Sequence, residues 1–178
     1  MKTTGISVRK LTYSALALAL ALVLPFLTGQ IPEIGSMLCP MHIPALLCGF
    51  LCGWPWGMAV GAVSPVLRSL IFGRPPMFSA VGMAFEMAVY GAAAGFLYKK
   101  FPKTKPYIYC TLVAAMVAGR LVWGVVQMFL MGLQDSVFTM EAFIAGAVTS
   151  AIPGIILQLI LIPVLVMALE KAKLMLND

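Results

Sequence analysis

The sequence predicts an all-α polytopic membrane protein with six transmembrane helices and with both termini in the cytoplasm. Apolar residues make up 62% of the 178 residues, charged residues only 10%, and the mean hydropathy is +1.02. Soluble domains carry about a quarter charged residues, so a soluble fold could not cover its surface here. A spanning helix needs about 20 mostly apolar residues. We therefore expect residues 1–178 to form a single six-helix transmembrane domain, with no separate soluble domain.

The positions of the basic residues predict the orientation. Nine of the twelve lysines and arginines fall in three short segments that flank apolar runs. These are Lys2, Arg9 and Lys10, then Lys99, Lys100, Lys103 and Lys105, and finally Lys171 and Lys173. The positive-inside rule assigns such segments to the cytoplasm. The net charge of +6 is thereby explained by the lipid bilayer, without a nucleic acid partner.

Glycine, proline and polar residues divide the chain into apolar runs that we expect to be helices. The runs cover residues 11–28, 37–51, 58–72, 77–98, 107–133 and 140–169. Residues 30–36 form a polar loop on the outside, and residues 53–57 (Gly-Trp-Pro-Trp-Gly) are expected to form a tight turn. An even number of helices agrees with the charge bias, because it returns the C-terminus to the cytoplasm.

Few polar side chains fall within the predicted helices, and they mark a candidate binding site. They are Arg68, Glu86, Arg120, Gln127 and Gln158, with Arg74 near the outer edge. An arginine in the middle of a membrane costs about 2.5–3.5 kcal/mol on insertion scales, so such residues normally face the protein interior or a wet cavity. These groups could converge on an outward-facing polar pocket. The alternative for Glu86 and Arg120 is a structural ion pair.

The excess of arginine suggests an anionic ligand. Arg68 has no obvious acidic neighbour except Glu33 in the first outer loop. An unpaired guanidinium suits a carboxylate or phosphate, which it binds through two parallel hydrogen bonds.

No catalytic set is found, so an enzyme is not predicted and no cofactor is expected. The chain has one histidine, and it lacks His-Glu-x-x-His, Gly-x-Ser-x-Gly and a Walker phosphate loop. Met37, Cys39, Met41 and His42 are soft-metal ligand types. The alternative is a helix entry with a hydrogen-bonded histidine, and we predict no metal site. Any uphill transport would need a partner or an ion gradient.

The first apolar run carries a strip of small residues. Ala15 and Ala19 are four residues apart, as are Ala17 and Ala21. Small residues at this spacing allow another helix to approach closely. The alternative is ordinary packing within the molecule.

These features together resemble the substrate-binding S component of an energy-coupling factor (ECF) transporter. Six helices in fewer than 200 residues, the alanine strip and the lack of an ATP site carry the resemblance. Residues 38–49, 65–77 and 84–91 are similar to stretches of vitamin-type members. The resemblance extends from the first helix to the Pro153–Gly154 region.

The resemblance implies a subunit of the bacterial cytoplasmic membrane that binds a vitamin with high affinity in a pocket open to the outside. Its partners would be a transmembrane coupling subunit and two cytoplasmic ATPase subunits. The alanine strip would contact the coupling subunit, and the loop that contains Glu33 would act as a lid. The implied pocket residues are Glu86, Arg120, Gln127, Gln158, Arg74 and Arg68.

The resemblance leaves the substrate open between vitamins. Pantothenate is the first candidate because the arginines favour an anion, and riboflavin is the second. Nickel- and cobalt-type relatives use a histidine near the N-terminus, which Met1-Lys2-Thr3-Thr4 lacks. Two other functions remain open: a stand-alone carrier with Glu86 as its proton site, and a soft-metal permease built on Cys39, Met41 and His42.

Overall fold

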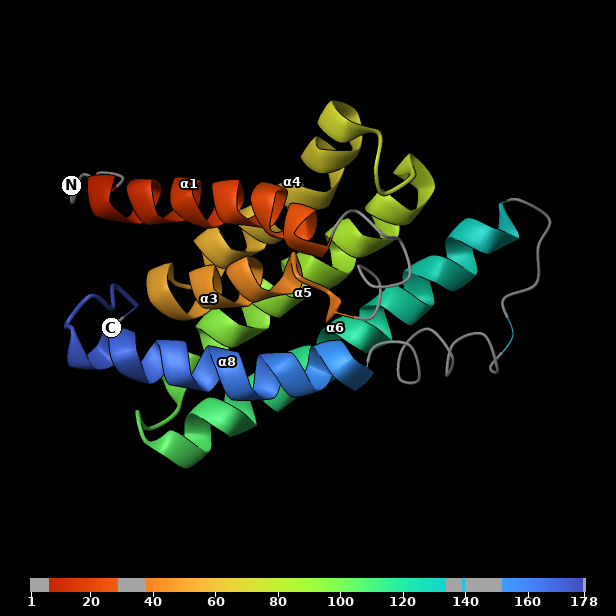
Figure 1. Ribbon diagram of the computed structural model, residues 1–178. Helices are drawn as coiled ribbons and strands as arrows, with labels where there is room; N and C mark the ends of the chain where they lie inside the picture. Colours follow the sequence, from red (N-terminus) through yellow and green to blue (C-terminus); the bar gives the residue numbers. More distant parts are fainter. Residues whose placement is uncertain (1–6, 29–37, 134–138, 140–151, 178) are drawn as a thin grey trace, which may run out of the picture.

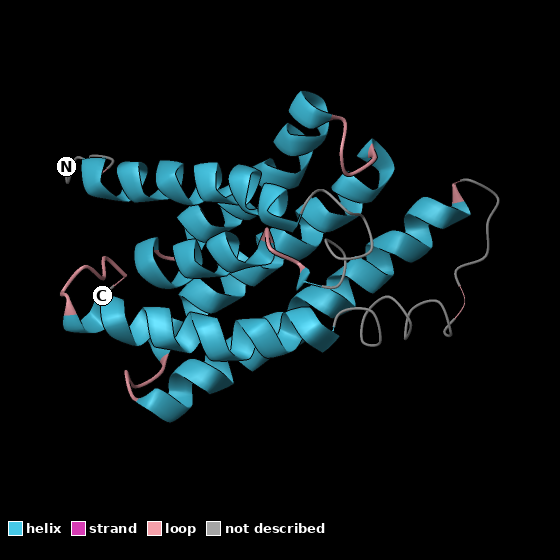
Figure 2. Ribbon diagram, viewed as in Figure 1, coloured by secondary structure: helices cyan, strands magenta, loops and turns pink. Residues whose placement is uncertain are grey.

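The computed structural model describes residues 7–28, 38–133, 139 and 152–177, and every element within these ranges is a helix (Figure 2). The elements are α1 (Val8–Val23), the 3₁₀ helix η1 (Leu24–Thr28), α3 (His42–Cys52), α4 (Trp54–Phe72), α5 (Met77–Lys100), α6 (Lys105–Gly132) and α8 (Ile152–Lys171). Within the described ranges, five spans are long and apolar enough to cross a bilayer, and α3 is a shorter apolar helix. The predicted all-α polytopic class is confirmed.

The outer surface of the helices is apolar and the interior contains polar side chains. On α6, exposed residues recur every four positions at Val113, Val117, Leu121 and Val125. By contrast, several polar residues are buried: Ser14, Ser64, Arg68, Glu86, Thr111 and Gln158. An exposed apolar surface of this extent is unsuited to water and suited to lipid.

The second helix is only about half as long as a spanning helix. The apolar run at residues 37–51 predicted a transmembrane helix, but α3 has 11 residues, which corresponds to about 16 Å against a hydrocarbon thickness of about 30 Å. Pro44 lies in its first turn, where the missing N–H would have no helical partner anyway. Nearly all of α3 is buried, so it is an interior element of the bundle.

The break between α3 and α4 is a single residue, which corrects the predicted turn at residues 53–57. Gly53 has a φ of 100°, a backbone conformation open chiefly to glycine. Trp54 already begins α4, and Pro55 occupies its first turn, a position that favours proline. The third helix therefore begins four residues before the predicted residue 58.

Helix α5 lies in the middle of the bundle and contacts α3, α4 and α6 (Figure 1). Its contact with α4 depends on glycines. A Cβ atom added to Gly91 would lie 2.2 Å from the carbonyl oxygen of Gly57, and one added to Gly61 would lie 2.2 Å from that of Met87. Small residues four apart, such as Gly91 and Gly95, permit this close approach. The backbone that carries Glu86 is thereby held tightly against α4.

Both termini lie at the same end of the molecule (Figure 1). The thiol of Cys52 donates to the backbone carbonyl of Lys10 at 3.8 Å, and the backbone N–H of Leu176 donates to the carbonyl of Leu51 at 2.9 Å. The chain ends thus meet the C-terminal end of α3. This grouping agrees with the predicted arrangement of termini, although the cytoplasmic assignment itself remains a prediction.

Three predicted segments lie wholly or partly outside the described residues. The outer loop at residues 30–36, which contains Glu33, is one, and the break between the apolar runs at 107–133 and 140–169 is another. The sixth apolar run was predicted for residues 140–169. Its part from residue 152 onward forms α8, which continues to Lys171.

Candidate substrate-binding site

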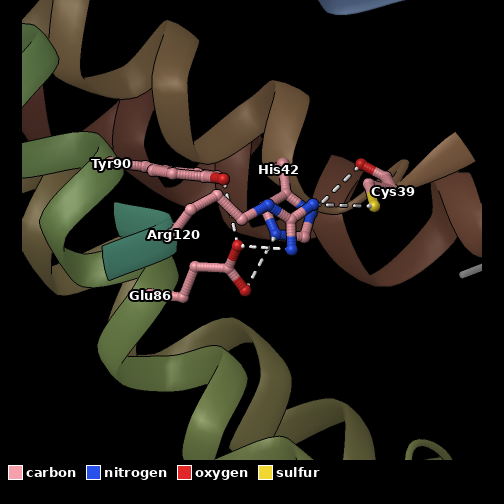
Figure 3. Close-up of polar contacts among 5 residues, drawn as sticks. All are labelled: Cys39, His42, Glu86, Tyr90 and Arg120. Atoms are coloured by element: carbon pink, nitrogen blue, oxygen red, sulfur yellow. Dashed lines mark hydrogen bonds and ion pairs between the residues drawn. The ribbon is translucent and has the colours of Figure 1, made fainter. Parts of the chain in front are cut away.

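Glu86 lies at the centre of a buried polar cluster (Figure 3). Its Oε1 accepts hydrogen bonds from Arg120 Nη1 at 2.9 Å and from the Tyr90 hydroxyl at 3.0 Å. His42 Nε2 is 3.6 Å from its Oε2. Glu86 is only 1% exposed. The predicted proximity of Glu86 and Arg120 is therefore present, in the form of an ion pair.

Three helices bring these side chains together. His42 is the first residue of α3, Glu86 and Tyr90 are one turn apart on α5, and Arg120 comes from α6. Gly119 makes room for Tyr90, because a Cβ atom at Gly119 would lie 2.1 Å from the tyrosine ring. The cluster thus depends on close packing of α5 against α6.

Cys39 completes the cluster from the turn that precedes α3. It has a φ of 46°, which is uncommon for a residue with a side chain. Its carbonyl oxygen lies 3.3 Å from His42 Nδ1, and its sulfur lies 3.9 Å from Arg120 Nη2 (Figure 3). Cys39 therefore connects the histidine to the arginine.

Arg120 retains hydrogen-bonding capacity that the described residues do not use. Its Nη1 is committed to Glu86, its Nη2 has only the contact with the Cys39 sulfur, and its Nε is buried without a partner among the described residues. Sulfur is a weak acceptor. The Nε and Nη2 donors point in parallel and form the edge with which a guanidinium binds a carboxylate.

The two predicted glutamines contribute further buried acceptors. Gln127 Oε1 faces Gly82, where an added Cβ atom would lie 3.0 Å away, and Gly82 is one turn from Glu86 on α5. Gln158 on α8 is 2% exposed. Neither Oε1 atom has a hydrogen-bond partner among the described residues. Buried polar groups are nearly always paired, so each calls for a partner.

Arg68 lies in a different environment from the Glu86 cluster. Its Nη1 donates to the carbonyl oxygen of Leu22 in the last turn of α1. Its guanidinium lies 4.9 Å from the centre of the Phe26 ring and 5.3 Å from that of Phe72. The side chain therefore ties α4 to α1 and η1. Arg74 is exposed in the loop between α4 and α5.

The alanine strip divides between two faces of α1. Ala17 is 8% exposed and Ala21 is fully buried, and Ala17 packs in an apolar cluster with Cys48, Cys52 and Val60. Ala15 and Ala19 are exposed. Of the four alanines, only Ala15 and Ala19 are therefore open on the surface of this chain.

His42 and Tyr90 are members of the cluster that were not predicted as substrate-binding residues. His42 was considered as a possible metal ligand, together with Met37, Cys39 and Met41, or as a hydrogen-bonded histidine at a helix entry. Met41 instead packs in an apolar cluster with Ala45 and Met87. Tyr90 could have been found from its spacing, since residues four apart on a helix are neighbours and its hydroxyl reaches Glu86.

The apolar exterior and the buried ionised cluster define a multi-pass membrane protein with a polar site in its interior, an arrangement typical of transport proteins. The family model described as "ECF transporter, substrate-specific component" matches residues 9–167. The chain therefore belongs to the family of substrate-specific components of ECF transporters, as the resemblance predicted. This is a family of transport components and not of enzymes. No curated protein and no solved structure matches the chain.

Proposed function

We propose that the chain binds a small vitamin that carries a carboxylate, with Arg120 as the anchoring residue. It would do so with high affinity and without ATPase activity of its own, as the S component of an importer in the bacterial cytoplasmic membrane. Pantothenate, which has a carboxylate, fits this proposal better than riboflavin, which has none.

The observation that carries the proposal is the parallel pair of donors on Arg120. Glu86 holds the guanidinium by Nη1, which leaves Nε and Nη2 facing away from the ion pair. A carboxylate on that edge would receive two parallel charge-assisted hydrogen bonds. The buried donor at Nε, which has no partner among the described residues, would then be satisfied.

Two side-chain amides with buried acceptors would bind the rest of the ligand. Gln127 and Gln158 each have a buried Oε1 without a partner among the described residues, and these atoms would accept from hydroxyl or amide groups of the vitamin. Arg68 contributes less to this proposal, because Leu22 and two aromatic rings already engage its guanidinium. Arg74 and the loop with Glu33 remain candidates for the entrance and the lid.

Family membership supports partners that supply the energy. We propose a transmembrane coupling subunit and two cytoplasmic ATPase subunits, since the sequence has no phosphate-binding loop of its own. Ala15 and Ala19 are exposed and four residues apart, which suits close packing of a partner helix.

Native mass spectrometry of the chain purified from cells grown in rich medium tests the ligand class directly. We expect a co-purified small molecule and, after its removal, saturable binding of pantothenate by calorimetry. Pantothenol, in which an alcohol replaces the carboxylate, should bind at least about 100-fold more weakly, because charge-assisted hydrogen bonds contribute about 1.5–3 kcal/mol each. Equal binding of both compounds would exclude the carboxylate anchor.

Substitution of one arginine at a time tests the role of Arg120. Arg120→Gln should reduce affinity by a similar factor, whereas Arg74→Gln removes the same charge from the exposed loop and should have a smaller effect. Absence of binding across a panel of vitamins would contradict the proposal as a whole. Uptake into liposomes by the purified chain alone would instead indicate a secondary carrier.

A further inference from the structure

A cavity of about 570 Å³ opens at the end of the molecule where the termini meet. It is lined by Lys10 of α1, by Trp54 and Trp56 at the start of α4, by Lys99 and Lys100 at the end of α5, and by Asn177 of the C-terminal tail, among others. It shares no residue with the Glu86 cluster. Neither ligand binding by Arg120 nor a contact at the alanine strip makes use of it.

Specific contacts hold the walls of this cavity in place. The Asn177 side-chain amide donates to the carbonyl oxygens of Gly95 at 2.8 Å and Gly49 at 3.4 Å, which fixes the C-terminal tail against α3 and α5. The Cys52 thiol, also in the lining, contacts the carbonyl oxygen of Lys10 at 3.8 Å. Tertiary contacts between α1, α3, α5 and the C-terminal tail therefore hold the residues that line the cavity in place.

The lining is strongly basic. Of the described residues that line the cavity, three are lysines and none is acidic. The Lys100 ammonium lies 5.8 Å from the centre of the Phe96 ring, at the edge of the same cavity. A compact anionic group would neutralise several of these ammonium groups at once, and phosphate is such a group.

The rim of the cavity is aromatic and apolar. Trp54 is 47% exposed and Phe96 is 54% exposed, which suits the boundary between lipid tails and headgroups. Met58, one turn further along α4 from Trp54, is also exposed. A molecule with a charged head and an apolar tail could therefore place its head among the lysines and its tail along the helices.

We propose that this cavity binds the phosphate headgroup of one anionic phospholipid of the inner leaflet, such as phosphatidylglycerol. Lys10, Lys99 and Lys100 contact the phosphate, and the acyl chains leave past Trp54 and Phe96. A lysine near an anionic membrane surface strengthens the attraction by about fivefold. The proposal depends on the predicted cytoplasmic orientation of this end but not on the identity of the transported substrate.

Tryptophan quenching by brominated lipids in nanodiscs tests this inference. Trp123→Phe leaves Trp54 and Trp56, both in the cavity lining, as the remaining tryptophans of the three in the chain. Brominated phosphatidylglycerol should quench their fluorescence at a mole fraction at least about fivefold lower than brominated phosphatidylcholine, which is the contribution of a single lysine. Equal quenching by the two lipids would overturn the proposal, and this comparison requires no change to the lysines.

Two sets of lysine substitutions distinguish lipid binding in the cavity from attraction by the general positive charge at this end of the molecule. Lys10, Lys99 and Lys100 changed together to Gln should abolish the preference for phosphatidylglycerol. Lys103, Lys105 and Lys171 changed together to Gln remove the same charge outside the cavity lining and should preserve the preference. Equal loss in both sets would mean diffuse surface attraction and would overturn the proposal. Thermal unfolding of each variant checks that it is folded.

Free phosphate is distinguished from lipid by a soluble competitor. Millimolar glycerol phosphate should leave the preference for phosphatidylglycerol unchanged, because it lacks the acyl chains that fix the lipid against the rim. If it removes the preference, the cavity takes soluble phosphates and the lipid assignment is wrong.

Discussion

Removal of the charge on Glu86 should destabilise the protein strongly. Glu86→Gln keeps the size of the side chain but leaves the Arg120 guanidinium without its counter-ion at a distance of 2.9 Å. It also weakens the hydrogen bond from Tyr90 and the contact with His42. Breaking a buried ion pair from one side costs about 3–5 kcal/mol. We take the lower end, about 3 kcal/mol, because the Gln carbonyl can still accept one hydrogen bond.

Thermal unfolding of the purified protein in detergent measures this effect. For a chain of this size, about 3 kcal/mol corresponds to a decrease in Tm of roughly 6–12 °C. Glu170→Gln is the matched control, because Glu170 also accepts a hydrogen bond from a tyrosine, Tyr98, at a less buried position. A neutral hydrogen bond in place of a charge-assisted one there should cost about 1 kcal/mol.

A double-mutant cycle isolates the ion pair from the rest of the cluster. Arg120→Gln alone should also be destabilising, because it leaves Glu86 buried and unpaired. The Glu86→Gln, Arg120→Gln double variant should lose less stability than the sum of the two single variants, by about 2 kcal/mol. Additive effects, or a Glu86→Gln shift no larger than that of Glu170→Gln, would refute the assignment of a buried ion pair.

Five further substitutions test the packing and the alanine strip. Gly91→Ala should cost about 1–3 kcal/mol, because its Cβ atom would lie 2.2 Å from the Gly57 carbonyl, whereas Gly132→Ala meets open space and should leave Tm unchanged. Asn177→Ala leaves the Gly49 and Gly95 carbonyls without their donor and should cost about 1–3 kcal/mol by thermal unfolding. An unchanged Tm would mean that the C-terminal tail is not held there. Ala17→Leu should lower Tm because Ala17 is buried, while Ala15→Leu should preserve Tm and reduce co-purification with the coupling subunit; the reverse pattern would exclude Ala15 as a partner contact.

The fold class was predictable because it depends on quantities summed over the whole chain. Scarce charge and long apolar runs require a bilayer, and no tertiary contact has to be known for that conclusion. Helix ends were less predictable where proline and glycine act in combination. Trp54 and Pro55 were expected in a turn, although proline is well tolerated at the start of a helix.

The pairing of Glu86 with Arg120 was within reach of the sequence, since both lie near the middle of neighbouring helices and bear opposite charges. The environment of Arg68 could not be predicted from the sequence. Its partner is the backbone carbonyl of Leu22, and the carbonyls in the last turn of a helix lack intrahelical partners whatever the side chains are. A search for acidic neighbours therefore could not find it, and the arginine remained an apparent anion site.

The short length of α3 explains why the Glu86 cluster lies in the middle of the molecule. Its C-terminal end lies near the chain termini, so its 11 residues bring His42 only about 16 Å from that end, close to the middle of a bilayer. The turn at Cys39 then falls inside the membrane, where non-helical backbone is tolerated only within protein or beside a cavity. Glu86, Tyr90 and Arg120 surround that turn with polar groups. The half-length helix is thus the feature that lets α5 and α6 carry a buried ion pair next to the candidate binding site.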